Sequence, residues 1–182
     1  MIKRMICAAA AALAMILPGA GQAADMCSTI GATQAFDYET RCVSSVLSPQ
    51  SGNRYDIHSL TDDNPATAWC EGRNGHGQGE TITLNWGNAA PLQAILIQNG
   101  YAKSNKSWSR NSRIRDIRIT LHLPGGPRSI TVTLADTPDE QKIALPWSRT
   151  TPIGAHIEIL SVWPGTHYTD TCVSGLSTDF GF

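Results

Sequence analysis

Regular alternation of apolar and polar residues constrains this fold more than any other feature of the chain. Residues 81–86, 117–123 and 130–134 each place an apolar side chain at every second position. Successive side chains of a strand point to opposite faces, so this pattern predicts strands with one buried face. The Pro-Gly-Gly-Pro run at 124–127 lies between the last two stretches and predicts a hairpin. Three residues of the first stretch are expected to point inward: Ile82, Leu84 and Trp86.

The other expected strands are shorter or less regular. Residues 93–98 are apolar on both faces, which predicts a central strand covered on both sides. Further strands are expected at 42–47, 142–145, 155–162 and 176–180. Beyond the N-terminus, no window of about twelve residues has the periodicity of an amphipathic helix. About eight short strands, separated by Gly, Pro, Asn and Ser, predict an all-β sandwich or jelly roll.

The N-terminus indicates the compartment. Lys3 and Arg4 precede an apolar run at 6–17, and small residues follow, which is the pattern of a secretory signal peptide at 1–23. The run is too short to span a bilayer, so we expect a secreted or periplasmic protein with no membrane span. Without Lys3 and Arg4 the formal net charge falls from −1 to about −3, which does not favour a nucleic-acid partner.

Four cysteines remain after the signal peptide: Cys27, Cys42, Cys70 and Cys172. An even number in an exported chain indicates two disulfides, for which three pairings exist. We favour Cys27–Cys42, a local clip, with Cys70–Cys172 tying the middle of the chain to its C-terminal end. Four thiolates on zinc would need paired C-x-x-C spacing, which is absent. We expect residues 24–40 to form an N-terminal arm and residues 41–182 to form one packed domain.

Residues 62–80 form a shaped loop, because they combine acids, a proline and four glycines. Trp69 and Cys70 are expected to fix this loop to the core, with Trp69 as a packing residue and not a platform for sugar. Glu71 and Glu80 are expected to brace the glycines between them. An alternative assigns these two acids to a small glycoside hydrolase, in which two carboxylates flank the scissile bond.

Several motifs occur together in a recognisable order. They are Ser44-Ser45 with Leu47, Tyr55, D-D-N-P-A-T-A-W-C-E-G from Asp62, G-Q-G-E at 77–80, N-G-Y-A-K-S at 99–104, N-S-R at 111–113, W-P-G at 163–165 and D-T-C-V-S at 170–174. Together they resemble the NADase-type glycan-binding domain, a discoidin-like module first described at the N-terminus of a streptococcal NAD glycohydrolase. The resemblance covers about residues 41–180. It implies a galactose-binding-like jelly-roll β-sandwich that binds a glycan or glycoconjugate and is not an enzyme. Gly175 departs from the pattern, where the family usually has Glu.

The segment from Tyr101 to Arg118 is rich in basic and aromatic residues. Aromatic rings stack on the apolar faces of sugars, and arginine donates paired hydrogen bonds to carboxylates or hydroxyls. An acidic or galactose-like glycan would suit such a surface. The candidate glycan-binding residues are Tyr101, Lys103, Trp108, Asn111 and Arg113, with Glu71 and His76 from the glycine-rich loop. The alternative is a solvated loop in which Asn111 and Arg113 hold neighbouring backbone.

Two further hypotheses remain open. Asp62 and Asn64 resemble part of a calcium loop, which predicts a structural calcium, although calcium needs six to eight oxygen ligands and Gly175 supplies no acid. The same fold could also serve as a protein-interaction or envelope-structural module whose partner is an envelope or host-surface protein.

Overall fold

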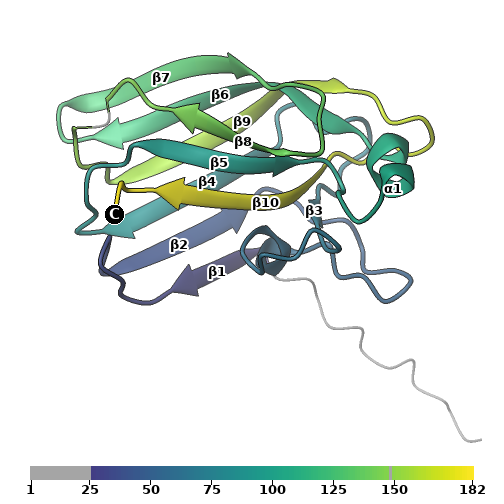
Figure 1. Cartoon of the computed structure of the whole chain (residues 1–182), viewed down its shortest axis with the longest axis horizontal. Coiled ribbons are helices and arrows are strands. Elements are labelled where there is room, and N and C mark those ends of the chain that lie inside the picture. Colours follow the sequence, from purple (N-terminus) through teal and green to yellow (C-terminus); the bar gives the residue numbers. More distant parts are fainter. Residues whose placement is uncertain (1–25, 148) are drawn as a thin grey trace, which may run out of the picture.

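Two antiparallel sheets form the protein in the computed structural model, which describes residues 26–147 and 149–182. The predicted signal peptide lies outside the described residues. The larger sheet has the order β1 (Cys27–Ile30), β2 (Tyr38–Val43), β4 (Thr81–Gly87), β9 (Gly154–Trp163), β6 (Arg113–Leu123) and β7 (Gly126–Thr133). The smaller has the order β3 (Trp69–Cys70), β10 (Cys172–Asp179), β5 (Ala94–Asn99) and β8 (Glu140–Ala144). Figure 1 shows the smaller sheet packed in front of the larger one, which confirms the predicted all-β jelly-roll sandwich.

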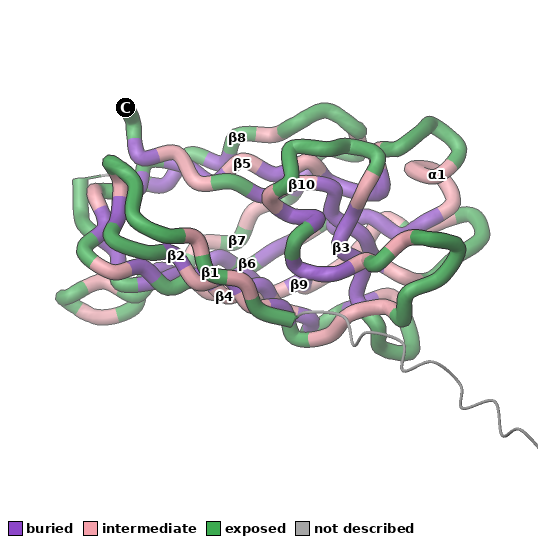
Figure 2. Tube along the Cα trace, turned by 90° about the horizontal axis from the view of Figure 1, so that it is seen from below, coloured by how far each residue is buried: buried purple, intermediate pink, exposed green. Residues whose placement is uncertain are grey.

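The core lies between the two sheets, where the buried stretches of both layers face each other (Figure 2). Ile82, Leu84 and Trp86 are buried as the alternation predicts. The expected hairpin is also present, because β6 pairs with β7 from Asp116 opposite Thr133 to Leu123 opposite Gly126. Its turn is the predicted Pro-Gly segment.

The first strands differ from the prediction. We expected a strand at 42–47 after an arm at 24–40, but β2 ends at Val43, and β1 and the first half of β2 lie within the expected arm. The reason is that two inward-facing residues of β2 are charged, which hides the alternation. Glu39 and Arg41 are buried and form an ion pair with each other. Glu39 also accepts a 2.6 Å hydrogen bond from the Trp86 indole nitrogen.

Strand β5 is central but is covered less than we predicted. Ile95 and Ile97 are buried, whereas Leu96 and Gln98 on the other face are half-buried. Two short helices also occur, the 3-10 helix η1 (Ile57–Leu60) and α1 (Asn105–Arg110). Both are shorter than the window in which amphipathic periodicity is visible, so sequence patterning could not detect them.

Both favoured disulfides are confirmed. Cys27–Cys42 joins β1 to β2 at residues that face each other in the register. Cys70–Cys172 joins β3 to β10 in the same way, across 102 residues of sequence. Within the described residues, no helix is long and apolar enough to cross a membrane.

Candidate functional site

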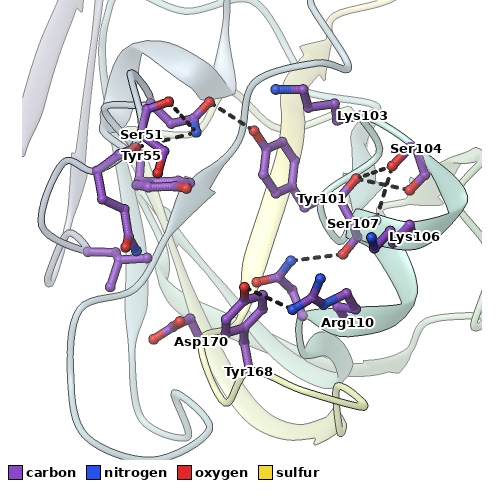
Figure 3. Close-up of a pocket in the computed structure, with 14 residues that line it drawn as sticks. Ser51, Tyr55, Tyr101, Lys103, Ser104, Lys106, Ser107, Arg110, Tyr168 and Asp170 are labelled. Atoms are coloured by element: carbon purple, nitrogen blue, oxygen red, sulfur yellow. Dashed lines mark hydrogen bonds between the residues drawn. The ribbon is translucent and has the colours of Figure 1, made fainter.

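A cavity of about 340 Å³ lies among the loops at the end of the sandwich that carries α1. Three segments that are distant in sequence line it: the loop between β2 and η1, the stretch from Tyr101 to the end of α1, and the loop between β9 and β10. Figure 3 shows Ser51 and Tyr55 on one side, residues of α1 on the other, and Tyr101 between them.

Helix α1 is held by polar caps at both ends. The Ser104 hydroxyl accepts a hydrogen bond from the Ser107 backbone nitrogen at 3.1 Å, as an N-cap residue does. The Asn111 side-chain amide donates to the Ser107 carbonyl at 2.8 Å (Figure 3). A helix of six residues is too short to be stable alone, so these contacts and its packing fix its position.

Trp108 anchors α1 to the sandwich. Its indole nitrogen donates to the Asn99 carbonyl at 3.2 Å, and the Arg113 guanidinium lies 4.3 Å from its ring centroid. Arg113 also donates two hydrogen bonds to Asp136, at 2.8 and 3.1 Å. Gly100 passes beside both side chains with φ of +82°, and a Cβ there would lie under 3 Å from each. Glycine is therefore needed for α1 to approach so closely.

Tyr55 and Tyr101 form an edge-to-face pair with ring centroids 6.2 Å apart. The Tyr101 hydroxyl lies 3.2 Å from each of two hydrogen-bond acceptors, the Asn53 side-chain oxygen and the Ala66 carbonyl oxygen. Burial raises the pKa of both phenols, so they stay neutral donors. Tyr55 has φ of +58°, which is rare for a bulky residue and marks locally strained backbone beside the cavity.

Arg110, Tyr168 and Asp170 line the remaining wall (Figure 3). Arg110 donates to the Tyr168 hydroxyl at 3.1 Å, and its guanidinium lies 4.9 Å from the Tyr168 ring centroid. Tyr168 is nevertheless 44% exposed. Burial raises the pKa of the Asp170 carboxyl above its ordinary value, because it disfavours the charged form.

The 62–80 loop contacts the cavity residue Tyr101 through Ala66 and Ala68, and its own side chains are largely used to hold its structure. Trp69 is fully buried, and its indole nitrogen donates to the Ser45 carbonyl at 2.9 Å. Glu71 is also fully buried, and its carboxylate accepts from the backbone nitrogens of Arg73 and Thr171 at 2.8 and 3.2 Å. Burial is the main cause that raises the pKa of Glu71.

Glu80 links the same loop to the end of β2. It accepts hydrogen bonds from the Ser44 and Ser45 hydroxyls, the first at 2.6 Å, and pairs with Arg73 at 3.0 Å. Both glutamates therefore contribute their oxygens to loop structure.

The candidate residues separate into two groups. Tyr101, Lys103 and Asn111 line the cavity. The other four lie outside its lining: Trp108, Arg113, Glu71 and His76. Trp108 and Arg113 hold α1 in place, and His76 lies 3.0 Å from the buried Ser112 hydroxyl through Nδ1.

The sequence analysis did not name Tyr168 or Asp170 as candidate glycan-binding residues, and it named Tyr55 only as part of a motif. One signal pointed to them. Residues 168–170 lie two to four positions before Cys172, whose predicted bond to Cys70 brings this segment to the end of the sandwich where the 62–80 loop lies.

The predicted calcium loop uses its side chains to close its own turn. Asp62 accepts from the Asn64 backbone nitrogen at 3.0 Å and from the Thr67 hydroxyl at 2.7 Å. Asn64 accepts from the Ala66 backbone nitrogen at 3.0 Å. Across residues 26–147 and 149–182, no group of three or more Asp, Glu, His or Cys side chains gathers as a metal site. These side chains do not fit the six to eight oxygens that calcium requires.

Residues 35–179 match the family model of the NAD glycohydrolase translocation F5/8 type C domain. The chain belongs to this family. The match extends over both sheets and the cavity, from the segment before β2 to the end of β10. The comparison with curated proteins found no match to this chain in sequence.

Solved structures with the same fold include several carbohydrate-binding modules. The family 32 module of NanJ from C. perfringens, in complex with galactose, has a TM-score of 0.55 at 16% identity, covering 77% of this chain and 92% of that one. A second family 32 module from Clostridium perfringens, in complex with GalNAc-β-1,3-galactose, has a TM-score of 0.58 at 16% identity, covering 77% and 94%. The family 32 module of AlyQ, in complex with 4,5-unsaturated mannuronic acid, has a TM-score of 0.53 at 15% identity, covering 76% and 92%.

Proposed function

We propose that this protein is an exported, non-catalytic glycan-binding module whose ligand binds in the cavity beside α1. The observation that carries the proposal is the joint presence in one cavity of tyrosine rings and polar donors. Tyr55, Tyr101 and Tyr168 line it together with Lys103 and Asn111. Aromatic faces pack against the apolar side of a pyranose, while hydroxyl, amide and ammonium groups bond its oxygens.

The size and position of the cavity agree with this role. Its volume of about 340 Å³ is within the range of small-ligand pockets. The similar family 32 modules were solved in complex with galactose, GalNAc-β-1,3-galactose and an unsaturated mannuronic acid. We extend to this chain the binding of a sugar and not the identity of any one of them.

The burial of Glu71 and Glu80 supports a non-catalytic role. The two residues are 0% and 2% exposed, and their carboxylate oxygens accept hydrogen bonds from neighbouring loops. A glycosidase instead needs two carboxylates that reach the scissile bond. Export is supported by the predicted signal peptide and by two disulfides, which persist in oxidising compartments.

A glycan array followed by calorimetry tests the proposal on the full chain, expressed for export so that its disulfides form. Tyr168→Ala removes an aromatic side chain that is 44% exposed, and we expect it to weaken glycan binding by about tenfold or more. Tyr38→Ala is the matched control, since this tyrosine is 47% exposed and starts β2 at the opposite end of the sandwich (Figure 1).

Folded protein that binds no glycan on the array would refute the proposal. A protein partner retained from cell envelope after glycosidase treatment, together with no glycan binding, would favour the protein-interaction module instead. Turnover of aryl glycosides that Glu71→Gln or Glu80→Gln abolishes would establish the hydrolase alternative.

A further inference from the structure

Several basic side chains that have no carboxylate partner among the described residues line the cavity. Lys103, Lys106 and Arg110 line it, and Asp170 is the acid among the lining residues. Elsewhere, basic side chains are mostly paired: seven of them form ion pairs with carboxylates, including Arg113 with Asp136. None of the ion pairs among the described residues includes Lys103 or Lys106, and both lysines are exposed. This excess contrasts with a sequence whose formal net charge is −1.

The spacing of two of these charges opposes helix stability. Lys106 and Arg110 are four residues apart on α1, so they lie on the same face one turn apart. Like charges in this arrangement repel and destabilise a helix by a few tenths of a kcal/mol. An anion bound between them would reverse that repulsion. The arrangement is therefore better suited to the bound state than to the free one.

Helix α1 and the Arg110 side chain are also held before any ligand arrives. Ser104 and Asn111 cap α1, Trp108 anchors it, and Arg110 is bonded to the Tyr168 hydroxyl. A rigid site loses less conformational entropy on binding than a flexible one. The half-exposed ring of Tyr168 lies directly beside the Arg110 guanidinium. A sugar ring and an anionic substituent on that ring would thus meet adjacent groups of suitable chemistry.

We propose that the cavity prefers glycans that carry an anionic group, a carboxylate or a sulfate ester, which Lys103, Lys106 and Arg110 bind. This inference rests on the proposed glycan-binding function and adds the class of sugar. An ammonium or guanidinium group bonded to a carboxylate or sulfate gives a charge-assisted hydrogen bond, which is about twice as strong as a neutral one. Because these side chains are exposed to solvent, the preference should weaken as salt rises.

The test compares matched pairs of oligosaccharides by calorimetry with the full chain. One arm uses oligogalacturonate against the corresponding neutral galactose oligomer, and the second uses a sulfated glycan against its desulfated form. We expect the anionic member of at least one pair to bind about tenfold more tightly at low salt, with the difference shrinking at high salt. The arm that responds identifies carboxylate or sulfate.

Lys103→Gln and Lys106→Gln should each reduce the ratio of anionic to neutral glycan affinity about threefold or more. Arg128→Gln is the matched control, because it removes one exposed positive charge from β7, outside the cavity. Neutral and anionic members that bind equally would overturn the inference and leave the proposed function standing. Binding of no glycan at all would overturn both. A single-stranded oligonucleotide that binds more tightly than every anionic glycan, and loses affinity in the lysine variants, would also overturn it.

Discussion

Replacing Trp69 by Phe tests whether the 62–80 loop is a scaffold that depends on one buried side chain. The Trp69 side chain is 0% exposed, and its indole nitrogen donates to the Ser45 carbonyl at 2.9 Å. Phenylalanine cannot donate this hydrogen bond, which leaves the carbonyl without its partner at a cost of about 1–3 kcal/mol. The smaller ring also leaves unfilled volume in the core, which adds about 1 kcal/mol. We therefore expect the free energy of unfolding to fall by about 2–4 kcal/mol.

Trp163→Phe provides the matched comparison, since it makes the same chemical change at the end of β9. The Trp163 indole nitrogen is buried but has no hydrogen-bond partner among the described residues. Its ring is only partly buried, with the Arg115 guanidinium 4.9 Å from the centroid. Removing an unsatisfied donor recovers its desolvation cost, so we expect a loss below about 1 kcal/mol. Urea unfolding monitored by circular dichroism measures both variants. Equal losses in the two variants would show that the hydrogen bond to Ser45 does not support the loop.

Two further predictions concern the disulfides and pH. Replacing Cys70 and Cys172 by Ser should lower the free energy of unfolding by about 5 kcal/mol, and replacing Cys27 and Cys42 should lower it by about 3 kcal/mol, because the closed segments span 102 and 15 residues. Only the first replacement should also weaken glycan binding, since the Cys70–Cys172 bond shares a buried cluster with Tyr101. Thermal unfolding and calorimetry measure these effects, and equal glycan binding in both double variants would contradict the link between the bond and the cavity. Burial raises the pKa of Asp170 in the folded state, so its contribution to stability is complete below the ordinary value of 3.8 and is lost as pH rises through the raised pKa. Asp170→Asn should therefore gain stability relative to the unmodified protein as pH rises above 3.8, and a difference that does not change with pH would refute the sign.

Prediction succeeded where the inward-facing residues are apolar. The strand at β4 and the hairpin of β6 and β7 followed directly from alternation, because Ile82 and Ile119 have the character that their burial requires. It failed at β2, where Glu39 and Arg41 face the core as a bonded pair. A buried charge is tolerated only with a partner, and the partners of Glu39 include Trp86 and Thr178 from distant parts of the chain. No local pattern could have identified them.

The candidate site was likewise predicted only in part. The basic and aromatic segment after β5 was visible in the sequence, and Tyr101, Lys103 and Asn111 line the cavity. Trp108 and Arg113 have the same residue types but face each other and Asp136. Composition alone cannot separate the side chains that open to solvent from those that hold the segment in place.

The sequence by itself was sufficient to predict most of the strands and turns, the two disulfides and the resemblance to the family. Those features depend on neighbouring residues, since alternation and turn formation are properties of a few consecutive positions. The tertiary structure alone decided which loops share the cavity. Tyr55, Tyr101 and Tyr168 meet there because antiparallel pairing of β10 with both β3 and β5 brings three distant segments to one end of the sandwich. Strand order and register are set by packing across the whole core, and that is information no short stretch of sequence contains.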